Sequence, residues 1–193
     1  MRKIGEIVQL QVQVDSLKQG EKNNRYYEPA GLRTVAALRL TPQGVVGLEG
    51  GQELSDVHHA DHPESKSRAL TNAISFNFTS HYTRMQERYG AHLSTGIAGE
   101  NILIATDETF EAAAFAGGVI IATKAGQQVP LTQITVAEPC APFSTFAIHQ
   151  DARPPAELLK ATLQFLDDGT RGFYCQQPSD PVVIQVGDVL FVR

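Results

Sequence analysis

Short apolar segments separated by turn residues recur along the whole sequence, and this pattern restricts the possible folds more than any other feature. The clearest example is residues 8–14, where Val8, Leu10, Val12 and Val14 alternate with three glutamines. A period of two is typical of a β-strand with one buried face. Comparable segments occupy residues 32–40, 45–48, 69–78, 101–105, 119–123, 129–136, 171–175, 182–186 and 189–192. Many short strands with frequent turns predict a closed or nearly closed β-barrel rather than a doubly wound sheet.

Glycine turns predict how some of these strands are connected. Residues 119–136 form a predicted hairpin around Gly126, and residues 182–192 form a second one around Gly187. Between these hairpins and the N-terminal strands, the segments 15–29 and 49–68 lack periodicity and are expected to be loops.

Two segments have helical rather than strand periodicity. Residues 81–90 follow Thr79 and Ser80, either of which is a suitable N-cap. Three bulky side chains share one face of this helix, which predicts core packing rather than a site: Tyr82, Met85 and Tyr89. Residues 156–168 carry a leucine stripe and form the clearest helix of the chain. We therefore expect one mainly β domain over residues 1–193, a β-barrel with peripheral short helices.

Composition and charge exclude several functional classes. The formal net charge of −5 argues against a nucleic-acid surface or an anionic membrane surface. No apolar run is long enough to span a membrane, and the N-terminus lacks a signal-peptide core. A chain without a leader is expected to be cytoplasmic, where its two cysteines would be free thiols.

The two cysteines differ in their surroundings. Cys140 lies between Pro139 and Pro142, which interrupt a regular strand ladder and place the cysteine at the rim of a strand. The alternative for Cys140 is the usual one for a lone cysteine, a small buried hydrophobic residue. Cys175 lies in an alternating segment on the same face as Phe173, which predicts a buried and inert thiol.

The two polar loops contain candidate ligand-binding residues. Residues 49–68 include three of the six histidines together with Asp56 and Asp61, but their spacing is a weak metal signal because no helix orders them. Residues 15–29 carry several basic and aromatic side chains, and this loop is either a lid or a solvated excursion.

Five short motifs in order resemble the MOSC domain family, the molybdenum-cofactor sulfurase C-terminal domain. They are Asp56-Val57-His58-His59, Gly99-Glu100-Asn101-Ile102, Glu138-Pro139-Cys140, Gly169-Thr170-Arg171-Gly172-Phe173-Tyr174 and Ile184-Gln185-Val186-Gly187-Asp188. The resemblance extends from about residue 8 to the C-terminus. It implies a MOSC-like β-barrel that binds the molybdenum cofactor or carries sulfur through one cysteine in a surface cleft.

The resemblance also assigns expected roles to individual residues. Cys140 matches the family's cysteine, so it is the expected catalytic residue and the metal ligand if molybdenum is bound. The expected cofactor-binding residues are Asp56, His58, His59, Lys66, Arg68, Gly99, Glu100, Asn101, Arg171 and Gly172. The sequence departs from the family pattern at Ser55 and Ala60, which replace glycines, and at Ala137, which replaces an arginine before the cysteine. Loss of that arginine removes a bidentate donor beside an anionic-ligand site.

Several interpretations remain open at this level. Glu100 and Asn101 either contact a ligand or satisfy their turn, His58 and His59 are either ligand-contacting or structural, and Arg171 either faces the cleft or pins a helix end. The protein is either a molybdenum-cofactor or sulfur-handling protein or a non-catalytic binding module on the same barrel. The first alternative requires a molybdopterin-type cofactor or a sulfur donor protein. Any redox partner would be supplied in trans, because the sequence has no dinucleotide-binding or ferredoxin-type motif.

Overall fold

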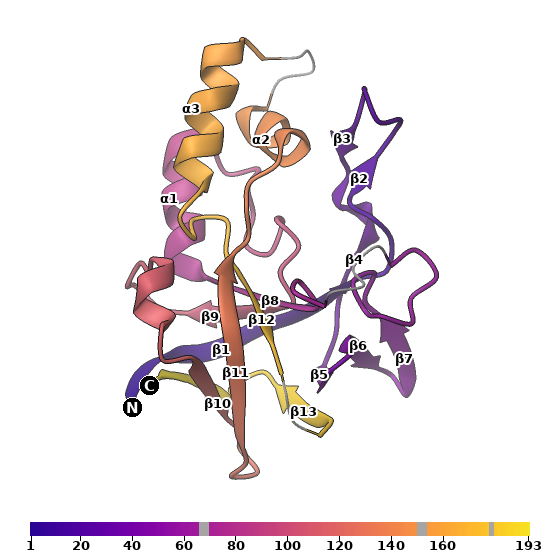
Figure 1. Ribbon diagram of the computed structural model, residues 1–193, viewed down its shortest axis with the longest axis vertical. Helices are drawn as coiled ribbons and strands as arrows, with labels where there is room; N and C mark the ends of the chain where they lie inside the picture. Colours follow the sequence, from indigo (N-terminus) through magenta and orange to yellow (C-terminus); the bar gives the residue numbers. More distant parts are fainter. Residues whose placement is uncertain (66–69, 150–153, 178–179) are drawn as a thin grey trace.

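The computed structural model describes residues 1–65, 70–149, 154–177 and 180–193 (Figure 1). The strands are β1 (Arg2–Gln13), β2 (Lys18–Gln19), β3 (Tyr26–Tyr27), β4 (Leu32–Thr34), β5 (Ala37–Thr41), β6 (Gly44–Glu49), β7 (Gln52–Ser55), β8 (Ile74–Phe78), β9 (Ile102–Ala105), β10 (Val119–Ala122), β11 (Gln128–Val136), β12 (Phe173–Gln176), β13 (Val182–Gln185) and β14 (Val189–Val192). The helices are α1 (Thr79–Tyr89), α2 (Ala141–Ile148) and α3 (Ala156–Leu166), with 3₁₀ turns η1 (Pro29–Gly31) and η2 (Ala112–Phe115). Lys66 and Arg68, two of the expected cofactor-binding residues, lie outside the described residues.

Seven strands close into a barrel in the order β1-β14-β10-β11-β12-β8-β9, and β9 pairs with β1 to complete it. The pairing of β8 with β9 is parallel, and the other pairings in the barrel are antiparallel. Parallel neighbours need a crossover connection, and the segment that contains α1 provides it. The predicted mainly β barrel with short peripheral helices is confirmed.

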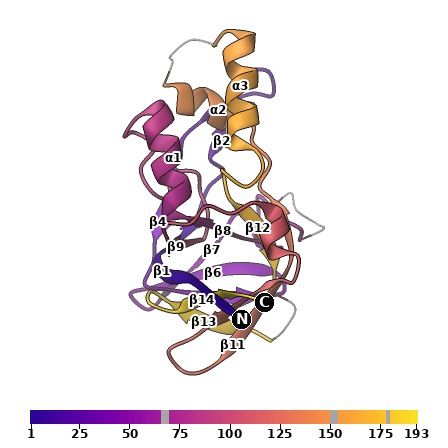
Figure 2. The same ribbon diagram turned by 90° about the vertical axis from the view of Figure 1, so that its left-hand side faces the viewer.

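Three further elements surround the barrel. Strands β13, β5, β6 and β7 form a separate antiparallel sheet, and β4 pairs antiparallel with the C-terminal end of β1. The short hairpin β2–β3 projects beyond the barrel toward the helices (Figure 1). Figure 2 shows that α1, α2 and α3 gather at the same end of the molecule. The helices and the hairpin thus lie on the same side of the barrel.

Two apolar clusters hold these layers together. The barrel interior is filled by aliphatic residues and by packed phenylalanines such as Phe76, Phe78 and Phe173. The second cluster lies under the helices and includes Tyr27, Tyr82, Met85, Phe143 and Leu166. Tyr27 contacts Phe143 edge-on with ring centroids 5.0 Å apart, so the hairpin packs directly against α2. Tyr82 and Met85 are buried in this cluster, as their helical spacing predicted.

The predicted hairpin over residues 182–192 is wrong. Strand β13 pairs with β5, whereas β14 pairs with β1 and β10. The turn between β13 and β14 is bound to β1, because the Gly187 amide donates to the Ile7 carbonyl and the Ile7 amide donates to the Asp188 carbonyl, both at 2.8 Å. The chain therefore passes from one sheet into the other at this glycine, with φ at +86°.

Smaller corrections concern element boundaries. The segment 32–40 splits into β4 and β5 where the Ala36 amide bonds the Glu49 carboxylate, and residues 49–68 contain the strand β7. Helix α1 has Phe78 as its N-cap, because the Thr79 hydroxyl is used to bond the Thr106 backbone instead. The Pro-flanked segment after Cys140 forms α2, a helix that the sequence analysis did not predict.

In the described part of the chain, no helix combines the length and apolarity needed to cross a membrane.

Candidate functional site

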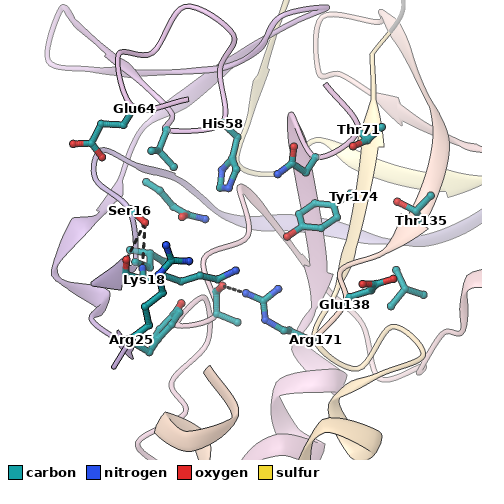
Figure 3. A pocket seen from close by; sticks show the side chains of 17 residues that line it. Ser16, Lys18, Arg25, His58, Glu64, Thr71, Thr135, Glu138, Arg171 and Tyr174 are labelled. Atoms are coloured by element: carbon teal, nitrogen blue, oxygen red, sulfur yellow. Dashed lines mark hydrogen bonds between the residues drawn. The ribbon is translucent and has the colours of Figure 1, made fainter. Parts of the chain in front are cut away.

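A cleft of about 710 Å³ opens between the β2–β3 hairpin, the loop after β7 and the ends of β11 and β12. Its wall includes Lys18, Arg25 and Tyr27 from the hairpin, His58 and Glu64 from the loop, and Glu138, Arg171 and Tyr174 from the barrel side. Figure 3 shows Lys18 and Arg25 on one side of the cleft, Tyr174 and Glu138 on the other, and the His58 ring pointing into the space between them. The segment 15–29 is therefore part of the cleft wall rather than a wholly solvated excursion.

Arg171 is a cation held at the cleft without a carboxylate partner. Among the described residues no acidic group lies within ion-pair distance of it. Its Nη2 donates to the Ala98 carbonyl at 3.3 Å, its guanidinium lies 5.1 Å from the centre of the Phe143 ring, and its Nε is buried with no partner in the described chain. The predicted alternative, an ion pair that pins the helix end, is not observed in these ranges.

Cys140 lies close to this cation. It is the N-cap of α2, with Pro142 in the first turn, and its side chain is half-buried. Burial alone would lower the pKa of Arg171. The acidic groups around it, Tyr174 and Cys140 first among them, outweigh burial and raise that pKa above its ordinary value, so the guanidinium stays charged. Cys140 is not itself part of the cleft wall, whereas Arg171 is.

Cys175 has the opposite environment. It is fully buried in the barrel core, and burial raises the pKa of its thiol well above the ordinary value. This agrees with the predicted inert role, and it leaves Cys140 as the accessible thiol of the two.

Asp56 is a fully buried carboxylate that organises the wall behind the cleft. Its Oδ1 accepts hydrogen bonds from the backbone and the ring Nδ1 of His58, both at 2.9 Å. Its Oδ2 accepts hydrogen bonds from the Gln13 backbone amide and from Asn101 Nδ2, also at 2.9 Å. Burial raises the pKa of Asp56, but the bonds from His58 and Gln13 outweigh it and hold that pKa below the ordinary value. Asp56 is therefore ionised and joins the loop after β7 to β1 and to the turn before β9.

Glu100 is the second buried carboxyl group, and it has a different environment. Its oxygens accept from Asn77 Nδ2 at 2.8 Å and from the Tyr82 hydroxyl at 2.7 Å. Burial raises the pKa of Glu100, and the bonds from Tyr82 and Asn77 do not fully offset it. Burial and the neighbouring Glu100 raise the pKa of Tyr82 well above its usual value, so its hydroxyl stays protonated and donates.

The segment 96–99 between these two carboxyls is fixed by side chains from several elements. Each of its four carbonyl oxygens accepts one side-chain hydrogen bond, in chain order from Gln11 Nε2 at 2.7 Å, Tyr27 Oη at 2.7 Å, Arg171 Nη2 at 3.3 Å and Gln13 Nε2 at 2.6 Å. The Ala98 amide also donates to the Tyr82 hydroxyl at 3.0 Å. Two tyrosine hydroxyls therefore hold the two ends of one peptide group. The loop that supports Arg171 is rigid for this reason.

Two glycines at this site have positive φ and little space for a side chain. Gly99 has φ of +94°, and a Cβ there would lie 2.7 Å from Gln13 Nε2 and from Leu17 Cδ1. Gly172 has φ of +111°, and a Cβ there would lie 2.9 Å from the Phe76 carbonyl. Only glycine combines this conformation with this clearance.

The comparisons with known proteins identify the family. A family profile described as the MOSC domain matches residues 55–191, which is more than half of the chain. The chain belongs to the MOSC domain family. A search of curated proteins gives no match.

Among solved structures, the YuaD protein from Bacillus subtilis is similar with a TM-score of 0.54 and 12% identity, over 98% of this chain and 93% of that chain. YiiM from Geobacillus stearothermophilus is similar with a TM-score of 0.50 and 19% identity, over 100% of this chain and 74% of that chain. At these identities the similarity shows that the fold is shared.

Within this MOSC fold, the motif residues expected from the sequence occupy different positions. His58 and Arg171 line the cleft, whereas Asp56, Glu100 and Asn101 are buried behind it. His59 is buried next to Gly44 and accepts the Asp61 amide through Nδ1 at 3.2 Å, away from the cleft wall. Ala137 is buried, and its amide donates to the Gly172 carbonyl.

Sequence reasoning missed several residues of the site. Tyr82 was assigned to core packing, but its hydroxyl also joins Glu100 to the loop that supports Arg171. Gln11 was expected on a solvent-exposed strand face, yet it is 3% exposed because the segment 96–99 covers it. Asn77 carried no signal beyond a polar side chain in an apolar segment, and Tyr27 none beyond an aromatic side chain in a possible lid; only the tertiary arrangement shows their hydrogen bonds.

Proposed function

We propose that this MOSC protein binds a molybdenum-cofactor-type ligand in the cleft, or carries sulfur beside it, and that Cys140 supplies the reactive thiolate. The observation that carries the proposal is Arg171, a half-buried cation at the cleft wall with a buried, unpartnered Nε and a neighbouring cysteine. An arginine in this state favours an anionic ligand and stabilises a thiolate. Membership of the MOSC family supports a binding role related to the molybdenum cofactor.

The side chains of the cleft match the chemistry of a phosphorylated pterin. Lys18, Arg25 and Arg171 would hold the phosphate, since none of them has an ion-pair partner in the described residues. Tyr174 adds an aromatic surface to the same wall. Ala137, where the family often has an arginine, carries no charge, so the three cations of the cleft would replace that donor.

The donor set also fits a metal that brings most of its ligands with it. In the described residues no group of three or more His, Cys, Asp or Glu side chains is arranged to hold a metal ion. A site built from protein ligands alone is therefore not indicated. Molybdenum bound to an organic cofactor needs one soft protein ligand, and the half-buried thiol of Cys140 is suited to that role. When bound, the cofactor would supply the redox centre, while Lys18, Arg25 and Arg171 would position it.

The sulfur-carrier role uses the same thiol without a metal. The Cys140 thiolate would attack the outer sulfur of a donor persulfide, forming a new persulfide on Cys140 and releasing the donor as a thiolate. The helix N-terminus at Cys140 and the charge of Arg171 would stabilise the anionic product. A sulfur donor protein, and a redox partner for any reductive cycle, would act in trans.

Purification from a host that makes the molybdenum cofactor provides the direct test. We expect near-stoichiometric molybdenum, or a pterin-derived fluorophore, in the wild type and its loss in Cys140→Ser. Cys175→Ala is the matched control, because it removes the buried thiol and leaves the cleft intact. If sulfur is carried instead, incubation with a cysteine desulfurase and cysteine should add about 32 Da to Cys140, reversibly with dithiothreitol.

The remaining outcomes are also informative. If the wild type contains neither metal nor pterin and gains no sulfur, the non-catalytic binding module becomes the better description. If Cys140→Ser keeps its molybdenum, the thiolate is not the ligand, and the proposed role of Cys140 fails.

A further inference from the structure

His58 is a cleft residue whose ring is fixed from behind by a buried carboxylate. Its Nδ1 lies 2.9 Å from Asp56 Oδ1, and its backbone amide donates to the same oxygen at 2.9 Å. The Asp56 side chain is 0% exposed, whereas the His58 side chain is 28% exposed and lines the cleft. The ring therefore has one end anchored in the protein interior and the other end in the ligand space (Figure 3).

The state of Asp56 determines which ring nitrogen carries the proton. Asp56 accepts four hydrogen bonds and is ionised, so Nδ1 of His58 must be the donor to it. In the neutral ring the lone pair then belongs to Nε2, which makes no hydrogen bond within the described residues. A second proton can therefore add only at Nε2.

Other histidines of this chain show what a structural role looks like. His81 is 0% exposed and uses both ring nitrogens, with Nδ1 bonded to the Gly169 carbonyl at 2.9 Å and Nε2 accepting the Phe110 amide at 3.0 Å. His59 is buried beside Gly44 and uses its Nδ1 to accept the Asp61 amide. His58 differs because its outer nitrogen is directed toward the cleft.

The charged groups that face His58 come from every wall of the cleft. Lys18 and Arg25 project from the hairpin, Glu64 belongs to the same loop as His58, and Arg171, Tyr174 and Glu138 project from the barrel side. Cations and carboxylates are therefore both present around the outer nitrogen of His58.

We propose that His58 is the acid–base residue of the cleft: its Nε2 contacts the bound ligand and exchanges one proton with it, while Asp56 orients the ring. The proton that Nε2 accepts comes from the ligand or from water at the cleft mouth, and it returns by the same route, so the residue ends each exchange as a neutral imidazole. The identity of the ligand as an anionic pterin rests on the proposed function. The assignment of the ring nitrogens does not.

The first measurement needs no ligand. Long-range ¹H–¹⁵N NMR of the free protein should show a neutral His58 ring protonated at Nδ1, with the signals assigned by their loss in His58→Gln. A His58 ring protonated at Nε2 would overturn the proposal.

The second measurement follows the binding of pterin-6-carboxylate by fluorescence between about pH 5 and pH 7, where imidazole side chains titrate. We expect wild-type binding to tighten about five- to tenfold toward the acidic end, and we expect most of this dependence to be lost in His58→Gln. His62→Gln is the matched control, because His62 is in the same loop but does not line the cleft. Glu64 and Glu138 remain in every variant, so only the difference between wild type and His58→Gln is attributed to His58.

The outcomes separate the two proposals. If His58→Gln keeps the wild-type pH dependence, or if His62→Gln loses it, the acid–base role is wrong. If the wild type does not bind the pterin at all, the cofactor-binding form of the proposed function fails, and the NMR result alone decides the assignment of His58.

Discussion

At the residue scale, Glu100 is the clearest case of a side chain whose burial opposes stability. Its folded-state pKa lies above the ordinary value of 4.5, so the unfolded chain releases its proton at a lower pH than the folded protein does. The unfavourable contribution is absent below the ordinary pKa and grows as the pH rises toward the folded-state pKa. A buried carboxylate retained under these conditions is expected to serve the site, here by holding Tyr82 and the loop that supports Arg171.

We therefore expect Glu100→Gln to gain stability relative to wild type as the pH rises above about 4.5, by at most about 1.4 kcal/mol per pH unit. The amide has nearly the same shape but does not ionise. Urea unfolding of both proteins from pH 4 to pH 8 measures the difference in stability. The lowered pKa of Asp56 changes stability with pH in the opposite direction, but both proteins share this effect, so it cancels in the difference. A loss of relative stability that grows with pH would contradict this account.

The two cysteines give a second prediction at this scale. A thiol probe should label Cys140 in the native protein, because its side chain is half-buried, and should label Cys175 only after unfolding, because it is 0% exposed. Mass spectrometry of tryptic peptides after native and denaturing labelling measures this, and Cys140→Ser should remove the native-state label. Faster labelling of Cys175, or a disulfide between the two, would show that the assignment of both environments is wrong.

Individual site residues could be predicted only where a local pattern marks them. The short motifs around His58 and Arg171 pointed to residues that do line the cleft. Tyr82 fits the apolar face of a helix by its spacing, and nothing in that spacing reveals that its hydroxyl meets Glu100 18 positions later in the chain. Gln11 belongs to the polar half of an alternating strand, and its burial depends on a loop 85 positions away.

At the element scale, helix α1 is attached to the rest of the molecule through His81. Its Nδ1 bonds the Gly169 carbonyl and its Nε2 accepts the Phe110 amide, so the ring must be neutral to make both contacts. Burial is the main cause that lowers the pKa of His81 from 6.5 to about 4. The stability that depends on the neutral ring is fully present above pH 6.5 and is lost as the pH falls toward 4.

We expect this single group to lower the free energy of unfolding by on the order of 3 kcal/mol between those two pH values. In His81→Asn, whose amide can still donate to the Gly169 carbonyl, the acid-induced loss should be smaller by that amount. Thermal unfolding by circular dichroism from pH 4 to pH 7 measures the effect, with His62→Gln as the control for removal of a histidine outside the core. An equally steep pH dependence in His81→Asn would rule out this role.

Elements with a strong periodic signal were predicted, and those defined by tertiary contacts were not. Helix α3 and the hairpin β10–β11 occur where the pattern placed them. Helix α2 was missed because Pro139 and Pro142 indicate the end of a strand, while Pro142 is equally compatible with a first helical turn. The helix is stabilised by the packing of Phe143 and Phe146 against Tyr27, a contact between segments more than a hundred residues apart.

At the scale of the whole molecule, the barrel is closed by its first and last strands. Arg2 lies opposite Val192 in the pairing of β1 with β14, and β14 also pairs with β10. The number and length of the strands predicted a barrel, but their order could not be deduced, because neighbours such as β12 and β8 are nearly a hundred residues apart in the sequence. Local turn signals favoured a hairpin between β13 and β14, whereas burial of Leu190 and Val192 in the barrel core requires β14 to pair with β1.

This arrangement predicts that the barrel does not form without β14. A chain that ends at Asp188 lacks Leu190 and Val192, which are 1% and 9% exposed, and leaves the facing edges of β1 and β10 without partners. Unpaired strand edges next to an opened apolar core promote aggregation. We expect this truncation to lose the cooperative thermal transition seen by circular dichroism and to elute as aggregates in size-exclusion chromatography.

Removal of Arg193 alone, whose amide makes one 3.3 Å bond to the Gly118 carbonyl, should leave both measurements nearly unchanged. Leu190→Ala should fall between them, with a cooperative transition that is weaker by about 2–5 kcal/mol. A cooperative transition in the chain that ends at Asp188, at a temperature close to that of the full chain, would show that β14 does not close the barrel.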